Sequence, residues 1–512
     1  MFSILRFTTL TRKKQQNCRI SRLTTICNII DYYIRKGYND IVIIHNIAVI
    51  NTYFRTPFIR KTDTPEMQLK MVKIRKKLSP FQTILLGFAG IILLGSFLLS
   101  LPVASKNREW TPYIDALFTS ASATCVTGLI AYDTASHWSV FGQVVILLLI
   151  QTGGMGIISV AAAFAILSGK KIGLFGRNIM KEAISAPTVG GIVRLTGFAI
   201  KGILLIELIG AIVLLFPFCK DYGAEGVWLA IFHSVSAFCN AGFDLFGDKS
   251  GQFSSLTAYK SDPVVNIVIT LLIIIGGIGF LTWEDVVNHK WRFKKYRTQS
   301  KLIIITSAAL ILLPAVYFFF FEYSDYPFGE RVLLSLFQSV SPRTAGFNTS
   351  DLTKFTDTGI ALMIVLMLIG GASGSTAGGM KVTTFAILLA SAGSVFYRKK
   401  NVTLLKRRIT DDTVKNAAAI AVMYITLFLL VGMTISTIES LPLKDCLFES
   451  ASAAATVGLT LGITPSLSVI SKLLLIGLMY AGRVGGLTLI YAALKNRNSD
   501  EGMLPSEQIA VG

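Results

Sequence analysis

Eight long apolar runs, arranged in four pairs, dominate the chain from residue 80 onward. They cover about residues 80–102 and 139–167, 193–217 and 263–283, 299–321 and 358–393, and 413–438 and 468–492. Each run has the ~20 residues that a helix needs to cross a ~30 Å hydrocarbon core. The pattern therefore predicts eight transmembrane helices.

A polar interruption lies between the two runs of each pair, and its sequence recurs four times. Its core is F-x-S-x-S, which begins at Phe118, Phe232, Phe337 and Phe448, and a glycine follows nine or ten residues later, at Gly128, Gly242, Gly346 and Gly458. The stretch from Tyr113 to Thr124 is about half a membrane-spanning helix. Pro112 and Pro442 precede the first and fourth copies at positions that suit a first helical turn. We expect four short helices that enter the bilayer and return as extended chain.

These patterns predict an all-α membrane protein of four tandem modules, each a helix, a short re-entrant pore helix and a second helix, around a pseudo-fourfold pore. Modules one to four cover residues 78–170, 171–297, 298–400 and 401–495. Residues 1–77 form a basic N-terminal extension, either a disordered arm or a stretch upstream of a true start near Met71. Residues 496–512 form a short cytoplasmic tail.

Composition and charge fit this membrane assignment. Of the 512 residues, 52% are hydrophobic, and the mean hydropathy of +0.61 exceeds that of ordinary soluble domains. The net charge is +20, and the basic residues gather in residues 1–77 and in the links between modules, around residues 170–194, 290–301 and 398–408. By the positive-inside rule these links lie in the cytoplasm, as do both termini, and this placement argues against nucleic-acid binding.

Enzyme and metal chemistry find little support in the sequence. The six cysteines and four histidines lack metal-ligand spacing, and no P-loop, H-E-x-x-H or G-x-S-x-G motif is present. The sequence therefore predicts neither an enzyme nor a bound cofactor.

The four glycine-containing stretches predict an ion pathway. Irregular backbone at membrane depth persists only where protein or a watery path surrounds it. Glycine permits positive φ, so that successive carbonyl oxygens can face a common axis and replace the hydration shell of a monovalent cation. The competing interpretation is that these small residues serve helix packing alone.

At these residues the sequence resembles the potassium transporter superfamily of Trk, Ktr and HKT proteins. The segments "TCVTGL", "CNAGFD", "RTAGFN" and "ATVGLTLG" are similar to its four selectivity-filter segments. The resemblance implies potassium uptake through carbonyls of twelve residues: Val126, Thr127, Gly128, Asn240, Ala241, Gly242, Thr344, Ala345, Gly346, Thr456, Val457 and Gly458. In plant members a serine in the first filter accompanies sodium transport, so Gly128 favours potassium.

Within this superfamily the chain resembles the Ktr-type membrane subunit. The only apolar run before residue 80, "DIVIIHNIAVINTYF", is short and interrupted by polar residues, whereas Trk-type proteins have two additional N-terminal spans. The resemblance implies a homodimer in the plasma membrane, sodium-dependent uptake, and regulation by a cytosolic ring of nucleotide-binding RCK subunits. K⁺, or Na⁺, is the transported ion.

The sixth apolar run contains glycines where a helix should continue. "LIGGASGSTAGGMKVTTF" holds Gly370, Gly371, Gly374, Gly378 and Gly379, and each helical glycine costs about 1 kcal/mol relative to alanine. In the family the matching segment is an intramembrane loop that obstructs the pore and moves with the regulatory ring. We assign Gly370–Lys381 as a gate, including Ser373, Ser375, Thr376 and Lys381. The alternative is a flexible packing kink.

Arg483 lies within the eighth run, where a charge is costly enough to indicate a function or a buried partner. The family has an arginine near this position, below the filter and close to the gate. The two open interpretations are a gate contact and a structural salt bridge.

Polar residues near the filters provide further candidates. Asp244 and Asn348 follow their filter glycines, and Glu449 lies in the fourth short helix. A carboxylate at the outer mouth would concentrate cations, whereas loop capping would be a purely structural role for Asp244.

Three other functions remain as alternatives to potassium uptake. They are a sodium-transporting member of the same superfamily, a secondary carrier with broken helices, and a structural subunit of an ion-motive ATPase. Carriers of that kind usually contain inverted repeats, whereas the charge pattern gives all four modules here the same orientation.

Overall fold

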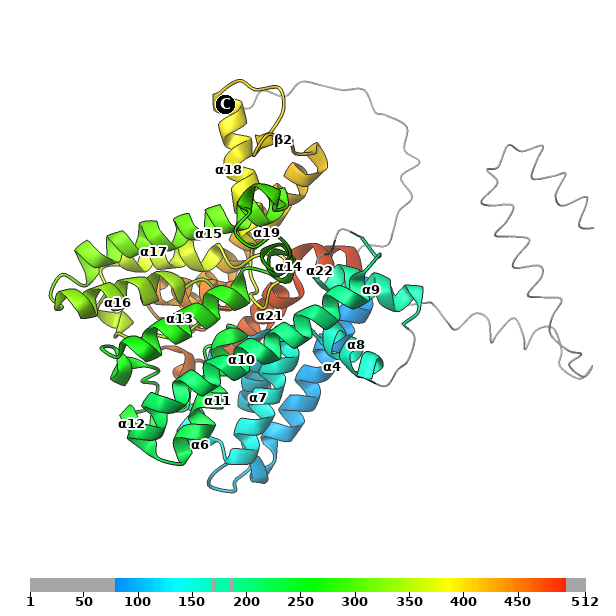
Figure 1. The fold of residues 1–512 in the computed structure, drawn as a ribbon. Helices are drawn as coiled ribbons and strands as arrows, with labels where there is room; N and C mark the ends of the chain where they lie inside the picture. Colours follow the sequence, from blue (N-terminus) through cyan, green and yellow to red (C-terminus); the bar gives the residue numbers. More distant parts are fainter. Residues whose placement is uncertain (1–78, 168–171, 185, 187, 494–512) are drawn as a thin grey trace, which may run out of the picture. The chain divides into compact units, whose positions relative to one another are not determined.

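The computed structural model describes residues 79–167, 172–184, 186 and 188–493. All of them belong to the unit Leu78–Gly512. The predictions for the N-terminal extension and the C-terminal tail fall outside the described residues. The described part is almost entirely helical (Figure 1).

Four long helices begin the four predicted modules. They are α4 (Pro80–Ser100), α10 (Ile192–Tyr222), α15 (Thr298–Tyr317, followed by a π-helical turn over Phe318–Glu322) and α19 (Asp411–Glu439). By length and hydropathy each can cross a membrane. The start of α4 is fixed by a capping box, in which the Ser79 hydroxyl accepts from the Gln82 backbone and the Gln82 side chain accepts from Ser79.

The short helices expected around F-x-S-x-S are present. They are α5 (Tyr113–Cys125), α11 (Glu225–Phe238), α16 (Phe328–Val340) and α20 (Leu443–Ala455). Pro112, Pro327 and Pro442 directly precede three of them. At 13 or 14 residues each rises about 20 Å, which is less than the hydrocarbon core. The phenylalanine of each motif is buried.

The second apolar run of every module is divided into two helices. The pairs are α7 (Val140–Met155) with α8 (Ile157–Leu167), α13 (Pro263–Gly277) with α14 (Phe280–His289), α17 (Asp357–Leu368) with α18 (Val382–Phe396), and α21 (Val469–Val484) with α22 (Gly486–Ala493). Gly156, Gly279 and Gly485 adopt φ of 81°, 89° and 89° at three of the breaks. Because a right-handed helix needs negative φ, these glycines end it.

These breaks modify the expectation of eight transmembrane helices. Among the described helices, four are long and apolar enough to cross a membrane, or five if α13 and α14, bent by 100°, count as one span. The remaining second runs consist of shorter helices, so eight crossings stay a prediction.

Small elements complete the described part of the chain. The remaining α-helices are α6 (Thr134–His137), α9 (Leu174–Ile184) and α12 (Gly247–Ser250), and strands β1 (Thr403–Leu404) and β2 (Arg407–Arg408) form an antiparallel hairpin. Short 3₁₀ turns cover Pro102–Ala104, Thr257–Tyr259, Phe293–Lys295, Leu352–Lys354 and Thr464–Ser466.

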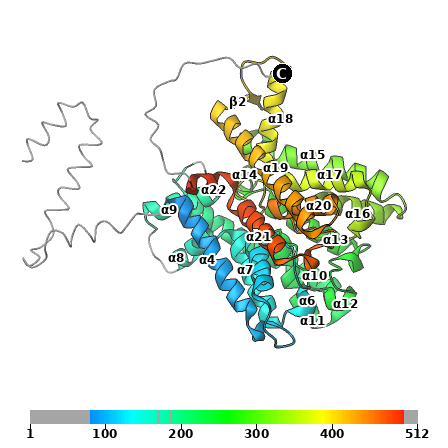
Figure 2. The same cartoon turned by 180° about the vertical axis from the view of Figure 1, so that it is seen from behind.

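The helices pack in a repeating order. Each short helix packs against the long helix of its own module and against the first half of a broken run in the neighbouring module: α11 on α7, α16 on α13, α20 on α17 and α5 on α21. Figures 1 and 2 show α4 and α7 side by side on one flank of the molecule. The last of these contacts joins module four to module one, so the order is circular.

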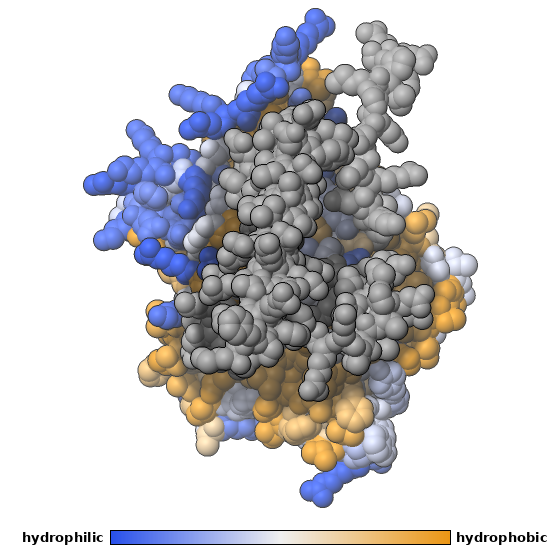
Figure 3. Space-filling model, turned by 90° about the vertical axis from the view of Figure 1, so that its right-hand side faces the viewer, coloured by the Kyte–Doolittle hydropathy of each residue, from blue (hydrophilic) through white to orange (hydrophobic). Residues whose placement is uncertain are grey.

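The outer surface suits a lipid environment. On α10, large apolar side chains such as Leu204, Leu208, Ile212 and Phe216 are exposed. Figure 3 shows apolar residues over much of the lower half of one face and hydrophilic residues at its upper left and its lower end. A helix that is apolar on its exposed side is stable in hydrocarbon but not in water.

Candidate ion pathway

After each of the four short helices the chain adopts left-handed φ at the same two positions relative to the motif glycine. Two residues before each glycine, a non-glycine residue has left-handed φ: Val126 at 59°, Asn240 at 61°, Thr344 at 75° and Thr456 at 53°. The glycines follow with φ of 95° at Gly128, 71° at Gly242, 82° at Gly346 and 95° at Gly458. Four copies of one uncommon conformation indicate a shared geometric requirement.

The four glycines contact one another in a closed ring. A Cβ on Gly128 would lie 2.4 Å from the carbonyl oxygen of Ala241, and a Cβ on Gly242 would lie 2.8 Å from that of Ala345. A Cβ on Gly346 would lie 2.4 Å from the carbonyl oxygen of Val457, and a Cβ on Gly458 would lie 2.2 Å from that of Thr127. Each oxygen belongs to the residue before the next glycine. The order is module one, two, three, four and back to one. All twelve filter candidates thus lie in four adjoining segments.

The second serine of each F-x-S-x-S motif supports its own segment. Ser122 and Ser452 accept from the backbone N–H of Gly128 and Gly458, each at 3.0 Å. Ser236 donates to the Phe243 carbonyl at 2.7 Å, and Ser341 donates to that of Phe347. These bonds hold backbone groups that regular secondary structure leaves unpaired.

The predicted gate residues form an irregular loop between α17 and α18. Its two ends are joined where the Gly370 N–H donates to the Met380 carbonyl at 2.8 Å and the Val382 N–H donates to that of Gly371 at 3.0 Å. Within the loop, Lys381 donates to the Ala377 and Gly378 carbonyls at 2.8 and 3.2 Å, and Ser375 donates to the Ala372 carbonyl at 2.7 Å. The Ser373 hydroxyl is hydrogen-bonded to that of Thr383 in α18 at 3.2 Å.

This loop, residues 370–381, packs against the end of the second short helix and against two of the glycine segments. Thr376 Oγ1 donates to the carbonyl of Phe238 at 3.2 Å. A Cβ on Gly378 would lie 2.0 Å from Thr456 Oγ1, and one on Gly370 would lie 3.2 Å from Thr344 Cγ2. The loop therefore adjoins the C-terminal end of the second short helix and the third and fourth filter segments.

Arg483 joins the loop to module one. Its guanidinium donates to the carbonyls of Thr376 and Gly153, and to that of Gly154 at 3.1 Å. Within the described part of the chain it forms no ion pair, so a salt bridge does not explain its position. Arg483 also lines a cavity of about 270 Å³, together with Lys381, Tyr424, Ser375 and Gly374 among others.

The polar residues predicted near the filters form local hydrogen bonds. Asp244 accepts from the Phe246 N–H at 3.1 Å, and burial raises the pKa of its carboxyl to about 7. Asn348 donates to the Ser350 carbonyl at 3.0 Å. Glu449 accepts from Thr464 and, at 2.8 Å, from Thr460. For Asp244 the capping contact is present, and attraction of cations by the same carboxylate stays a prediction.

Polar side-chain contacts that join neighbouring modules, which we call clasps, were not predicted from the sequence. Lys260 pairs with Glu330 at 3.1 Å, Asp357 with Lys444 at 2.8 Å, and Lys472 with Asp115 at 2.7 Å. Each clasp joins the start of a second run to the start of the next short helix, across the boundaries two–three, three–four and four–one. A charged residue near each of these helix starts was visible in the sequence. Its partner could not be identified, because the two residues of each pair lie far apart in the chain.

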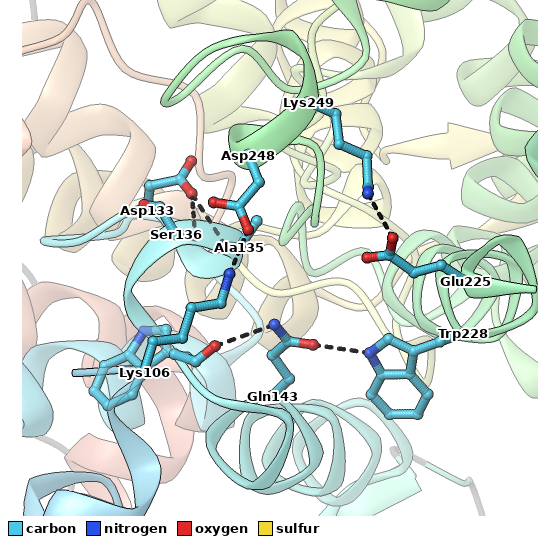
Figure 4. A network of polar contacts seen from close by, with 10 residues as sticks. Lys106, Asp133, Ala135, Ser136, Gln143, Glu225, Trp228, Asp248 and Lys249 are labelled. Atoms are coloured by element: carbon cyan, nitrogen blue, oxygen red, sulfur yellow. Dashed lines mark hydrogen bonds and ion pairs between the residues drawn. The ribbon is translucent and has the colours of Figure 1, made fainter. Parts of the chain in front are cut away.

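The boundary between modules one and two has a different clasp. Trp228 Nε1 donates to Gln143 Oε1 at 2.8 Å, and Lys106 pairs with Asp248 (Figure 4). Both contacts border a cleft of about 910 Å³, in which Lys249 also pairs with Glu225 at 2.8 Å. The four boundaries are thus all joined by polar contacts.

Comparisons with known proteins agree on one family. A family model described as TrkH, cation transport protein, matches residues 80–503. The potassium/sodium uptake protein NtpJ of Enterococcus hirae is 39% identical over 458 residues, covering 87% of this chain and all of that protein. The Ktr system potassium uptake protein B of Bacillus subtilis is 38% identical over 444 residues, covering 85% of this chain and 98% of that protein.

A solved structure supports the same fold. The crystal structure of the potassium transporter TrkH from Vibrio parahaemolyticus matches with a TM-score of 0.65 over 82% of this chain and 86% of that one, at 19% sequence identity.

Proposed function

Because the chain belongs to the TrkH family of cation transport proteins, we propose that it takes up potassium across the plasma membrane through a filter of four glycine segments. Its relatives are membrane transporters and not enzymes. The names of both relatives include potassium uptake, and potassium is the ion that this proposal assigns to the chain.

The observation that carries the proposal is the closed ring of glycines. In it the carbonyls of Thr127, Ala241, Ala345 and Val457 each meet the next glycine. Carbonyl dipoles around one axis can replace the water of a monovalent cation without a charged ligand. A side chain at any of the four glycines would occupy the space where the segments meet, so glycine is needed there for steric as well as conformational reasons.

We further propose that the four modules surround one pore per chain. In this arrangement α5, α11, α16 and α20 are re-entrant pore helices, and the divided second runs complete eight crossings. The circular packing of short helices on neighbouring second runs supports it. The C-terminal ends of the four helices add partial negative charge beside the filter.

The loop of residues 370–381 is the proposed gate, and Arg483 is the residue that holds the loop in its closed position. Three backbone carbonyls from the loop and from α7 accept from this guanidinium, so loop movement must break charge-assisted hydrogen bonds. We propose that a cytosolic nucleotide-binding RCK-type ring controls this movement, that both chain termini lie in the cytoplasm, and that the protein works as a homodimer.

The second candidate is sodium transport or sodium dependence, which the printed name of the Enterococcus hirae relative favours. Rubidium uptake into liposomes that contain the purified protein, measured with and without sodium, separates the candidates. Potassium uptake predicts rubidium flux that Gly128→Ser and Gly458→Ser reduce or make less selective. Absence of rubidium flux with robust sodium flux would favour the alternative, and flux insensitive to both substitutions would contradict the filter.

A further inference from the structure

Arg343 is a buried charge beside the third filter segment. It lies three residues before Gly346, and only 8% of its surface is exposed. One guanidinium nitrogen, Nη2, donates to Ser307 Oγ on α15 at 3.0 Å, whereas Nε has no hydrogen-bond partner. Among the described residues no acidic side chain forms an ion pair with it. An unpaired charge in the interior is costly because it loses its hydration, so a role that needs the charge is expected.

The corresponding positions of the other modules are neutral. Counting three residues back from each filter glycine gives Cys125 in module one, Cys239 in module two and Ala455 in module four. All three are fully buried. The arginine is therefore not needed for the left-handed residue and the glycine that follow it, because modules one, two and four adopt both without it, although module three reaches its glycine one residue sooner.

Module three also lacks a contact that the other modules share. The first serine of F-x-S-x-S donates to a carbonyl of the long helix in three modules: Ser120 to Ile92 at 2.7 Å, Ser234 to Glu207 at 2.6 Å and Ser450 to Phe428 at 3.0 Å. In module three Ser339 instead donates to Leu336 of its own helix at 2.8 Å. The bond from Arg343 to Ser307 therefore provides a link to α15 that Ser339 does not make.

We propose that Arg343 places a fixed positive charge behind the third filter segment and thereby weakens cation binding in the filter, with Ser307 as the residue that positions the guanidinium. The inference rests on the proposed function. A positive charge at this depth repels a cation on the axis more strongly than it would in water, because the surroundings are poorly polarisable. Conduction needs binding weak enough for release, and one charged segment among four provides that adjustment.

The test is the concentration dependence of rubidium uptake in liposomes. Arg343→Gln removes the charge and should lower KM at least about threefold. Arg343→Lys keeps the charge and should hold KM within about twofold of the wild type. Lys400→Gln removes a positive charge from an exposed position outside the filter and should leave KM unchanged.

A second variant keeps the test decisive if Arg343→Gln does not fold. Ser307→Asp places a carboxylate beside the guanidinium, which neutralises the charge without removing Arg343, and it should also lower KM. Unchanged KM in Ser307→Asp or in a folded Arg343→Gln, while the wild type transports rubidium, would overturn the inference. Absence of wild-type transport would instead contradict the proposed function itself.

Discussion

The four motif glycines are the positions at which the structure tolerates an added side chain least. Gly458 combines φ of 95° with a neighbouring carbonyl 2.2 Å from the place of its missing Cβ. Either feature alone would disfavour a side chain. Gly477 in α21 has open space around its missing Cβ and no positive φ, so it provides a matched control.

Gly458→Ala should abolish selective rubidium uptake, because the new methyl group would push apart the segments of modules four and one. Gly477→Ala should leave uptake unchanged and, with better helix propensity, stabilise α21 by up to about 1 kcal/mol. Rubidium uptake against sodium competition measures the difference. Equal activity of the two variants would contradict the steric argument.

At Asp244 the prediction concerns pH. Because burial raises the pKa of its carboxyl to about 7, the group is mostly neutral at pH 6 and mostly charged at pH 8. Apparent cation affinity should therefore rise as external pH increases from 6 to 8. Asp244→Asn should abolish this rise, so that the variant keeps the affinity measured at pH 6 over the whole range. Asp351→Asn, at an exposed loop position, should show the same rise as the wild type. A pH profile unaltered in Asp244→Asn would leave the carboxyl with its capping role alone.

Among the larger elements, the irregular loop of residues 370–381 and the short helices followed from the sequence, and the other helix breaks did not. Five glycines within 370–379 exceed what a helix tolerates, and Pro112 and Pro442 indicated where α5 and α20 begin. Gly156 and Gly485 are not distinctive in this way, because one glycine in an apolar helix costs only about 1 kcal/mol. Tertiary contacts decide whether such a helix breaks.

Arg483→Gln should raise rubidium flux through the gate, because a neutral amide cannot reproduce three charge-assisted bonds to Thr376, Gly153 and Gly154. The readout is initial uptake rate in liposomes without any regulatory subunit. Lys400→Gln removes a positive charge from an exposed position and serves as the control. An unchanged rate in the Arg483 variant would contradict the proposal that Arg483 holds the loop of residues 370–381.

Across the whole molecule, polar clasps join modules that are distant in sequence, which is why periodicity alone could not reveal them. Their burial differs. The Lys472 and Asp115 side chains are 11% and 14% exposed, whereas those of Lys444 and Asp357 are 48% and 85% exposed. Removing one partner of a buried pair leaves the other charge uncompensated, whereas exposed pairs contribute little.

Asp115→Asn should therefore lower the unfolding temperature clearly in detergent, with a loss of about 3 kcal/mol. Asp357→Asn should produce no measurable shift. Thermal unfolding of both variants beside the wild type provides the comparison. Similar shifts for the two would indicate that burial does not decide the strength of these clasps.

The central claim is that four glycine segments bind one dehydrated cation between them. Anomalous scattering from protein crystals soaked in thallium, a potassium substitute, tests it most directly. We expect a peak on the common axis, within coordination distance of the carbonyls of Thr127, Ala241, Ala345 and Val457. Thallium bound elsewhere in the protein, with none between these four carbonyls, would contradict it.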